Sequence, residues 1–365
     1  MVAHVMRTDL SGFPVAHPDL AADYDAILVV GFGGPEGRDD VLPFLENVTM
    51  GRNIPRERLL EVAEHYDHFA GVSPINAQVR ELIQALRIEL DAHGISLPIF
   101  WGNRNWHPLL GDTLAEMTCR GVKKALAVVL AAYSSYSSCR QYREDIARAQ
   151  AAAGPGAPHV DKMRVYYNHP VFIAANAERV RDALGQFMSG RRGDVHVAFT
   201  AHSIPAAMAR NCDYERQLTA TCRLVAEELG IPQERWALVY QSKSGRPGDP
   251  WLEPDILEHL RELSAGGTGA VLIHPIGFLS DHMEVLYDLD EEARMLSTEL
   301  GLEMVRSRTV GTHPLFVSLL RELIVERMGF LPEPGRRAVG DDGPSHDVCP
   351  ENCCLPKVSH GDALG

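Results

Sequence analysis

Short apolar runs that alternate with helical patterns constrain the fold of this chain more than any other feature. Such runs are typical of strands buried on both faces of a parallel sheet. They are residues 26–30, 125–130, 195–199, 237–240 and 270–273. Between them, apolar residues recur at helical spacing in residues 74–92, 174–187 and 214–229. This alternation predicts an α/β fold whose parallel sheets form two doubly wound, Rossmann-like halves.

Length and composition suggest how the chain is divided. Its 365 residues are enough for about two domains. Residues 150–159 are rich in Ala, Gly and Pro and mark a loop or linker. We expect an N-terminal extension, a first half, a second half whose final helix can pack back on the first, and a Cys-rich tail; these are residues 1–25, 26–155, 156–330 and 331–365. The tail has little apolar surface, so its order needs a cause other than burial.

Charge and hydropathy exclude several kinds of partner. Because 49 acidic residues outnumber 35 basic ones, the formal net charge is −14, whereas a nucleic-acid binder needs a basic face. No apolar stretch reaches the roughly 18 residues of a membrane-spanning helix. Residues 1–25 lack the apolar core of a secretory signal. We therefore expect a cytoplasmic protein without integral membrane association, and a monomer or weak dimer because no heptad pattern is present.

The first predicted strand ends in a glycine-rich turn, Gly31-Phe-Gly-Gly-Pro-Glu36. Ligand sites in open α/β sheets form beyond the carboxyl ends of strands. The turn departs from G-x-G-x-x-G, and Pro35 lacks an N–H donor, so phosphate binding is disfavoured. A tight turn that lets the backbone approach something flat is favoured instead. Phe32 would then project into a cleft; ordinary core packing is the alternative.

Three carboxylates follow the last predicted strand at helical spacing. Glu284, Asp288 and Glu292 fall at i, i+4 and i+8 on one helix face, where like charges repel. A solvated acidic face is the plain alternative, but apolar residues fill much of the same segment. A carboxylate ladder leading inward is a path for a divalent cation. With Asp281 and His282 at its head and His202 at the end of another strand, it predicts a mixed N/O site suited to iron.

From about residue 27 to residue 328 the chain resembles the ferrochelatases. The motifs that carry the resemblance are Val30-Gly-Phe-Gly-Gly-Pro-Glu36, Gly71-Val-Ser-Pro-Ile75, Gly102-Asn-Arg-Asn-Trp-His-Pro108, Phe199-Thr-Ala-His-Ser-Ile-Pro205, Tyr240-Gln-Ser-Lys243, Pro250-Trp-Leu252 and Pro275-Ile-Gly-Phe-Leu-Ser-Asp-His-Met-Glu-Val-Leu-Tyr-Asp-Leu-Asp290. The resemblance implies two Rossmann-like halves around a porphyrin cleft, and an enzyme of the lyase class that takes Fe²⁺ as a substrate in haem biosynthesis.

The resemblance also implies roles for the site residues. His202 and Glu284 form the facing pair across the porphyrin centre. His202 is the proton acceptor or an iron ligand, and Glu284 is the partner ligand or a proton conduit. Asp288 and Glu292 are the outer carboxylates of the iron path. The helix that carries Glu284 is expected to contain a wide π-type turn.

The edge of the expected cleft, called the lip here, indicates which porphyrin binds. Residues 53–70 are expected to form this lip, and they carry many charges, as a solvated surface does. A solvated lip favours coproporphyrin III and its product coprohaem over protoporphyrin IX. The porphyrin-binding residues implied by the resemblance are Phe32, Arg52, Ser73, Arg104 and Tyr142. Phe32 stands where some coproporphyrin enzymes have a Tyr that can ligate product iron, and Phe cannot. The sequence also leaves open a sirohydrochlorin-type chelatase and a non-catalytic haem or metal carrier.

Three of the seven cysteines lie close together in the tail: Cys349, Cys353 and Cys354. An odd number of cysteines, crowded at one end, does not suit a disulfide framework and favours metal binding. The resemblance implies a [2Fe–2S] cluster with Cys139 as the fourth ligand. Zinc and free thiols are the alternatives. The remaining cysteines are predicted to be packing residues; they are Cys119, Cys212 and Cys222.

Overall fold

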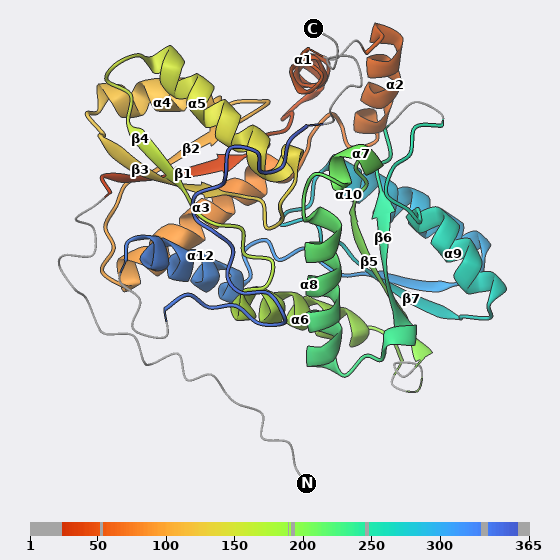
Figure 1. Cartoon of the computed structure of the whole chain (residues 1–365). Coiled ribbons are helices and arrows are strands. Elements are labelled where there is room, and N and C mark those ends of the chain that lie inside the picture. The colour runs from red at the N-terminus through yellow and green to blue at the C-terminus, as the bar shows by residue number, and fades with distance from the viewer. Residues whose placement is uncertain are drawn as a thin grey trace, which may run out of the picture.

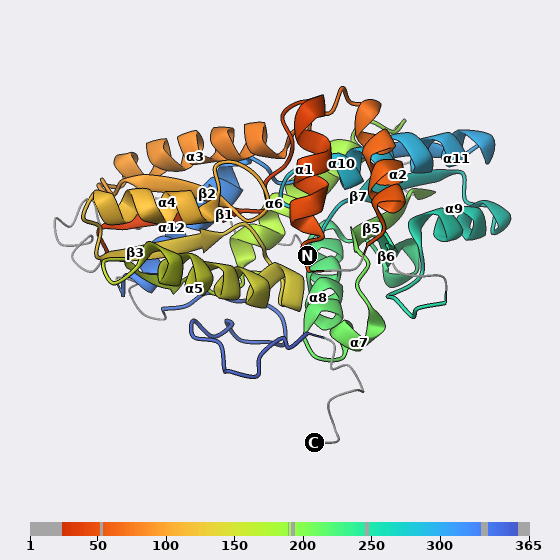
Figure 2. The ribbon, with the colours of Figure 1, turned by 90° about the horizontal axis from the view of Figure 1, so that it is seen from above.

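The protein consists of two parallel α/β halves placed side by side (Figures 1 and 2). This computed structural model describes residues 24–51, 54–188, 190, 194–244, 248–329 and 335–356. Both sheets are four-stranded, with orders β2-β1-β3-β4 and β6-β5-β7-β8. The predicted fold class is therefore confirmed.

The first sheet is built around β1 and β3, whose residues are buried on both faces. Successive side chains alternate between two helical layers, as the two-residue period of a strand requires. Ile27 and Val29 face a core that includes α3 and α12, whereas Leu28 and Val30 face α4 and α5. The bounds are β1 Ala26–Gly31, β2 Ile99–Asn103, β3 Lys124–Val129, β4 His159–Lys162, α3 Ile75–Ala92, α4 Leu110–Cys119, α5 Gln141–Ala153 and α12 Pro314–Arg327.

The second sheet repeats this arrangement around β5 and β7. Val197 and Phe199 face α6 and α8, while Ala198, Val271 and Ile273 face α9, α10 and η5. The bounds are β5 His196–His202, β6 Trp236–Gln241, β7 Ala270–His274, β8 Glu303–Arg306, α6 Pro170–Leu184, α8 Tyr214–Leu229, α9 Ile256–Ala265, α10 Met283–Val285, the π-helix η5 Leu286–Ala293 and α11 Arg294–Glu299.

One apolar core joins the two halves. It contains residues of both sheets together with α3, α6, α8 and α12. The final helix α12 packs against α3 of the first half and α6 of the second. The strand β4 belongs to the first sheet, where Lys124 pairs with His159. The first sheet thus extends to Lys162, beyond the boundary expected after residue 155.

Shorter elements complete the description. A pair of helices, α1 and α2, lies over the junction of the halves near α10 (Figure 2). Among the described residues, no helix is long and apolar enough to cross a membrane. The remaining bounds are α1 Arg38–Val48, α2 Arg56–Asp67, the π-helix η2 Tyr136–Arg140, α7 Ala206–Ala209 and the 3₁₀ helix η4 Gln233–Arg235.

Candidate active site and candidate metal centre

The carboxyl ends of three neighbouring strands bring the predicted site residues together. His202 ends β5 and pairs in register with Gln241, which ends β6. The strand β7 pairs with β5 on its other side, and the loop after β7 leads to α10, which carries Glu284. Parallel strands place their carboxyl ends at one edge of a sheet. The topology therefore explains why residues 82 positions apart, 202 and 284, meet.

His202 and Glu284 contact each other directly. The Nε2 atom of His202 lies 3.6 Å from Oε2 of Glu284. On the other side of the ring, Nδ1 lies within hydrogen-bond distance of the carbonyl oxygen of Ser203. Because a carbonyl only accepts, this contact fixes the proton of the ring on Nδ1. Nε2 is therefore the nitrogen that exchanges a proton with, or coordinates, whatever enters beside Glu284.

The two side chains form a charged pair. Burial disfavours the imidazolium, but the Glu284 carboxylate outweighs it and raises the pKa of His202 to about 9. Desolvation likewise disfavours the carboxylate, although 48% of the Glu284 side chain is exposed, and the His202 charge nevertheless lowers the pKa of Glu284 to about 2. At neutral pH the pair thus consists of an imidazolium and a carboxylate. His202 is not the free neutral base that an isolated histidine would be.

The spacing of the pair bears on one expectation. A porphyrin ring inserted between two side chains needs a van der Waals contact of about 3.5 Å on each face, or about 7 Å in all. The observed separation is 3.6 Å, so the pair in this arrangement leaves no room for a ring between its two side chains. The facing of His202 and Glu284 across the porphyrin centre stays a prediction, and the spacing favours a ring that meets both side chains from one side.

Asp288 lies behind Glu284 and is held by the end of β6. Its Oδ2 accepts hydrogen bonds from the Ser242 hydroxyl and, at 3.3 Å, from the Gln241 side chain. Burial, together with the charges of Glu284 and Glu292, raises the pKa of Asp288 to about 7. Burial also raises the pKa of Glu292. The charges of Glu284 and Glu292 therefore act on Asp288 along the helix, and the Asp288 carboxyl group exchanges its proton near neutral pH.

The helix that carries the ladder is widened. Residues Leu286–Ala293 form the π-helix η5, which directly follows Glu284. The expected π-type turn is thus confirmed. A π-helix closes its hydrogen bonds over five residues and is frequent at functional sites. Asp288 and Glu292 both lie on it.

Two residues at the head of the ladder have other partners. The Asp281 carboxylate accepts a hydrogen bond of 3.0 Å from Arg306, which also binds Asp290. The His282 Nδ1 accepts from the backbone N–H of Glu284 and so caps α10. An acid tied to a guanidinium and a histidine used as a cap make poor iron ligands. The pair His202 and Glu284 remains as the inner donor set.

The lip helix α2 contributes a residue that the sequence does not reveal. Tyr66 is buried beside Glu284; burial, and then the charge of Glu284, raises the pKa of Tyr66. The same helix contacts η5, because His65 stacks on Tyr287 at 4.1 Å between ring centroids and His68 lies 3.0 Å from Glu291. Residue 66 shares no motif or spacing with residue 284. Only the tertiary fold brings them together.

The expected porphyrin contacts differ in exposure. Phe32 is 38% exposed and packs edge-on against Phe44. Ser73, Arg104 and Tyr142 are less open: Ser73 and Tyr142 are each 4% exposed, and the Arg104 guanidinium pairs with Asp145 while lying over the Tyr142 ring. Arg104 also lies over Phe32, with its guanidinium carbon 5.8 Å from the ring centroid. Arg52 lies outside the described residues.

The four predicted cluster cysteines lie together. Cys139, on η2, forms a thiol hydrogen bond with Cys349 of the tail. The Sγ atoms of Cys353 and Cys354 are 3.5 Å apart. Cys349, Cys353 and His346 have ligand atoms that all lie within 4.8 Å of one another. The structure thus brings the internal cysteine and the tail cysteines to one place and adds a histidine.

Arginines fasten the tail loop around these thiols. Arg140 Nη1 donates to the carbonyl oxygens of Glu351 and Cys353 at 2.6 and 2.9 Å. Arg143 Nη1 donates to the carbonyl oxygen of Cys349 at 3.2 Å. Charged donors make stronger hydrogen bonds than neutral ones. They supply part of the order that the apolar-poor tail cannot gain from burial.

The thiols also have the charge environment of a metal centre. The hydrogen bond from Cys139 lowers the pKa of the Cys349 thiol to about 7, against burial and with help from Lys162 and Arg143. Burial and the neighbouring thiols raise the pKa of Cys354. Bound metal deprotonates such thiols outright. Four thiols and an imidazole are soft donors that fit an iron–sulfur cluster or zinc.

Comparisons with known proteins agree with this geometry. The family model described as Ferrochelatase matches residues 24–328. A "Ferrochelatase" of Rhodopirellula baltica is 56% identical over 91% of this chain and 93% of its own length. A "Coproporphyrin III ferrochelatase" of Streptomyces coelicolor is 48% identical over 95% of this chain and 98% of its own length.

Solved structures agree on the fold. The SirB protein of Bacillus subtilis with Fe³⁺ is 15% identical, with a TM-score of 0.53 over 83% of this chain and 97% of that one. The sirohydrochlorin chelatase SirB of Bacillus subtilis subspecies spizizenii in complex with cobalt is 14% identical, with a TM-score of 0.51 over 83% of this chain and 95% of that one. At these identities the likeness shows a shared chelatase architecture.

The charged pair predicts how His202 titrates. Glu284→Gln removes the largest of the contributions that raise the pKa of His202, so this pKa should fall from about 9 toward its ordinary value. The contribution of the raised His202 pKa to stability is complete below about pH 6.5 and is lost as the pH rises through about 9. The contribution of the lowered Glu284 pKa is complete above about pH 4.5 and is lost as the pH falls through about 2. NMR titration of the His202 ring protons measures the shift.

A matched control is Glu291→Gln, which removes a carboxylate of the same helix that lies beside His68. It should leave the His202 titration unchanged. A wild-type His202 that titrates at or below 6.5 would contradict the charged pair.

Proposed function

This chain belongs to the ferrochelatase family of metal-chelating lyases, and we propose that the porphyrin into which it inserts ferrous iron is coproporphyrin III, giving coprohaem. The proposal is supported first by its relatives. Several that are 47–48% identical over most of their length are named coproporphyrin III ferrochelatases, including those of Streptomyces coelicolor and Nocardia farcinica. The relative at 56% identity is named ferrochelatase without a porphyrin, so protoporphyrin IX is the alternative.

The lip supports the same choice. Helix α2 carries exposed charged residues, among them Arg56, Glu57 and Arg58. Coproporphyrin III has four carboxylates and is soluble in water, so it does not need an apolar, membrane-facing lip. Phe32 is exposed and offers a flat aromatic surface. Such a surface suits stacking against a planar ring.

The contact between His202 and Glu284 is the observation that carries the proposed mechanism. Iron insertion exchanges one Fe²⁺ for two pyrrole protons, so the site must bind a cation and accept two protons. Without a bound cation the pair is charged. When Fe²⁺ reaches Glu284, its positive charge lowers the pKa of the neighbouring imidazolium. His202, whose side chain is 33% exposed, then releases its proton to solvent, and Nε2 becomes free to accept a pyrrole proton or to ligate iron.

Asp288 is the second proton acceptor in this scheme. Its pKa of about 7 is matched to neutral pH, where general acid–base catalysis by a carboxyl group is most effective. Ser242 and Gln241 hold its carboxylate beside the Glu284 backbone. Glu292 continues the row on η5 and would receive Fe²⁺ from solvent and release protons to it. The three carboxylates thus serve both the entry of Fe²⁺ and the exit of protons.

Anaerobic Fe²⁺ insertion, measured side by side with coproporphyrin III and protoporphyrin IX, tests the function. We expect turnover with the tetracarboxylate and little with protoporphyrin IX. Glu284→Gln should lower turnover by about 10²-fold or more, the range of a lost acid–base group, while porphyrin binding persists. Glu291→Gln is the matched control on the same helix and should keep its activity.

Each contrary outcome points to a different correction. Preference for protoporphyrin IX would refute the lip argument and leave the mechanism standing. Full activity of Glu284→Gln would remove Glu284 from the mechanism. Binding of both porphyrins without any turnover would indicate a carrier.

We further propose that Cys139, Cys349, Cys353 and Cys354 hold a [2Fe–2S] cluster, with zinc as the alternative. The four thiols lie in contact in two pairs, and Arg140 and Arg143 supply positive charge around them. A cluster bound by thiolates is anionic, so these cations would stabilise it. When bound, the cluster would supply a redox-active centre and would cross-link the tail to η2.

Metal and sulfide analysis of the anaerobically purified protein tests this proposal. We expect iron and acid-labile sulfide in equal amounts and a visible absorption band, all lost in Cys349→Ser. Cys119→Ser, which removes an exposed cysteine at the end of α4, should leave them unchanged. A colourless protein that contains zinc and no sulfide would overturn the cluster.

A further inference from the structure

The tail centre contains more donors than a [2Fe–2S] cluster uses. Four protein ligands hold such a cluster, yet five soft donors lie here: the four thiols and the imidazole of His346. The His346 Nε2 atom is 4.0 Å from Cys353 Sγ. The ligand atoms of His346, Cys349 and Cys353 all lie within 4.8 Å of one another. One donor is therefore in excess, and the structure indicates which position it competes for.

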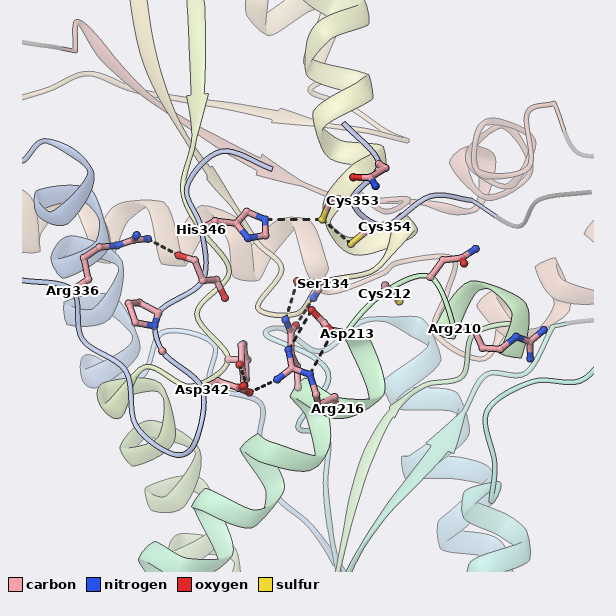
Figure 3. A pocket seen from close by; sticks show the side chains of 17 residues that line it. Ser134, Arg210, Cys212, Asp213, Arg216, Arg336, Asp342, His346, Cys353 and Cys354 are labelled. Atoms are coloured by element: carbon pink, nitrogen blue, oxygen red, sulfur yellow. Dashed lines mark hydrogen bonds and ion pairs between the residues drawn. The ribbon is translucent and has the colours of Figure 1, made fainter. Parts of the chain in front are cut away.

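The thiols fall into two contacting pairs. Cys139 and Cys349 are joined by a thiol hydrogen bond, and Cys353 contacts Cys354 at 3.5 Å. His346 Nε2 contacts Cys353 at 4.0 Å, and its ligand atom also lies within 4.8 Å of Cys349 Sγ. Figure 3 shows His346 and Cys354 on either side of Cys353, with a dashed line to each. The imidazole of His346 and the thiol of Cys354 thus both lie where they could ligate the metal that Cys353 binds.

The side chains of Cys354 and His346 differ in exposure and in their freedom to move. Cys354 is 3% exposed, and its backbone adopts a φ of 53°, which non-glycine residues rarely occupy. His346 is exposed at the rim of a hollow of about 770 Å³ that Cys353 and Cys354 also line. The imidazole therefore has room to approach or to leave, while the Cys354 thiol stays close to Cys353.

A second contact places His346 toward the cysteines. Its two chain neighbours are both bound by Arg336: the guanidinium donates to the Ser345 carbonyl oxygen at 2.5 Å and to the Asp347 carboxylate at 3.2 Å. Arg336 is itself tied to Glu326 of α12 at 3.1 Å. The backbone around residue 346 is therefore held against the body of the protein, and the imidazole can reorient about its own side-chain bonds.

We propose that His346 is a fifth ligand of this centre, exchanging with Cys354 on the metal that Cys353 binds. The inference rests on the proposed cluster. An imidazole can replace a thiolate on a [2Fe–2S] iron, and the replacement raises the reduction potential because it removes negative charge. The position beside Cys353, facing the hollow, is then the exchangeable one. Cys139, Cys349 and Cys353 then bind the cluster in both arrangements.

Substitutions at residues 346 and 354 test the exchange in the full-length protein. Cys354→Ser should keep at least half of the wild-type iron and sulfide, with a shifted visible spectrum and a higher reduction potential. Its reduced form should show nitrogen hyperfine coupling from the imidazole by EPR methods. His346→Ala alone should keep the cluster on four thiols. The double variant should lose it, as Cys349→Ser does.

Two controls keep the result interpretable. His93→Ala removes an imidazole at the end of α3 and should change none of these signals in the Cys354→Ser background. Cys354→Ala, which cannot ligate through oxygen, should behave as Cys354→Ser does, and circular dichroism reports whether each variant is folded.

The contrary results are distinct. Loss of iron in folded Cys354→Ser and Cys354→Ala to the level of Cys349→Ser, or a retained cluster without nitrogen coupling, overturns the exchange. A wild-type protein without iron and sulfide overturns the cluster and this inference with it. Iron insertion into coproporphyrin III is measured separately, so failure of the tail centre and failure of the proposed reaction remain distinguishable.

Discussion

The contact between His202 and Glu284 is the interaction on which the proposed chemistry of this protein depends. Neither residue is placed by its own neighbours in the chain. His202 ends β5, and Glu284 follows the loop after β7, so the contact exists only because the two strands are parallel and adjacent. The pair neutralises itself: a carboxylate near other carboxylates gains an imidazolium, and an imidazole in a partly buried place gains a counter-ion. That neutrality lets an acidic helix approach the apolar core of the second half.

The same pair explains the carboxylates behind it. Glu284, Asp288 and Glu292 follow one another along the helix and repel each other, which together with burial raises the pKa of Asp288 to about 7. Gln241 and Ser242, at the end of β6, offset part of this cost by hydrogen bonding to Asp288. A row of neighbouring acids maintained in this way lowers the stability of the fold and can bind a divalent cation. The structural cost and the proposed iron path are two consequences of one arrangement.

Much of this could be predicted from the sequence, and the failures have physical causes. The strands that the sequence does not reveal are β2, β4 and β8, which lie at sheet edges. The strands β4 and β8 contain polar residues and no apolar run, and β2 has only three apolar side chains in succession. The hidden β4 is also why the first sheet extends past residue 155. The spacing shows the ladder, but it does not show the capture of Asp281 by Arg306, because that contact depends on β8. Likewise, no motif could show that His202 and Glu284 contact each other directly, that Tyr66 lies near Glu284, or that His346 lies near the tail cysteines.

The structure of the protein with metal-free coproporphyrin III bound is the most direct test of the central claim. We predict that His202 and Glu284 lie on the same face of the macrocycle, with Nε2 directed at the pyrrole nitrogens and Asp288 behind Glu284. A macrocycle inserted between the two side chains, or bound away from both, would contradict it.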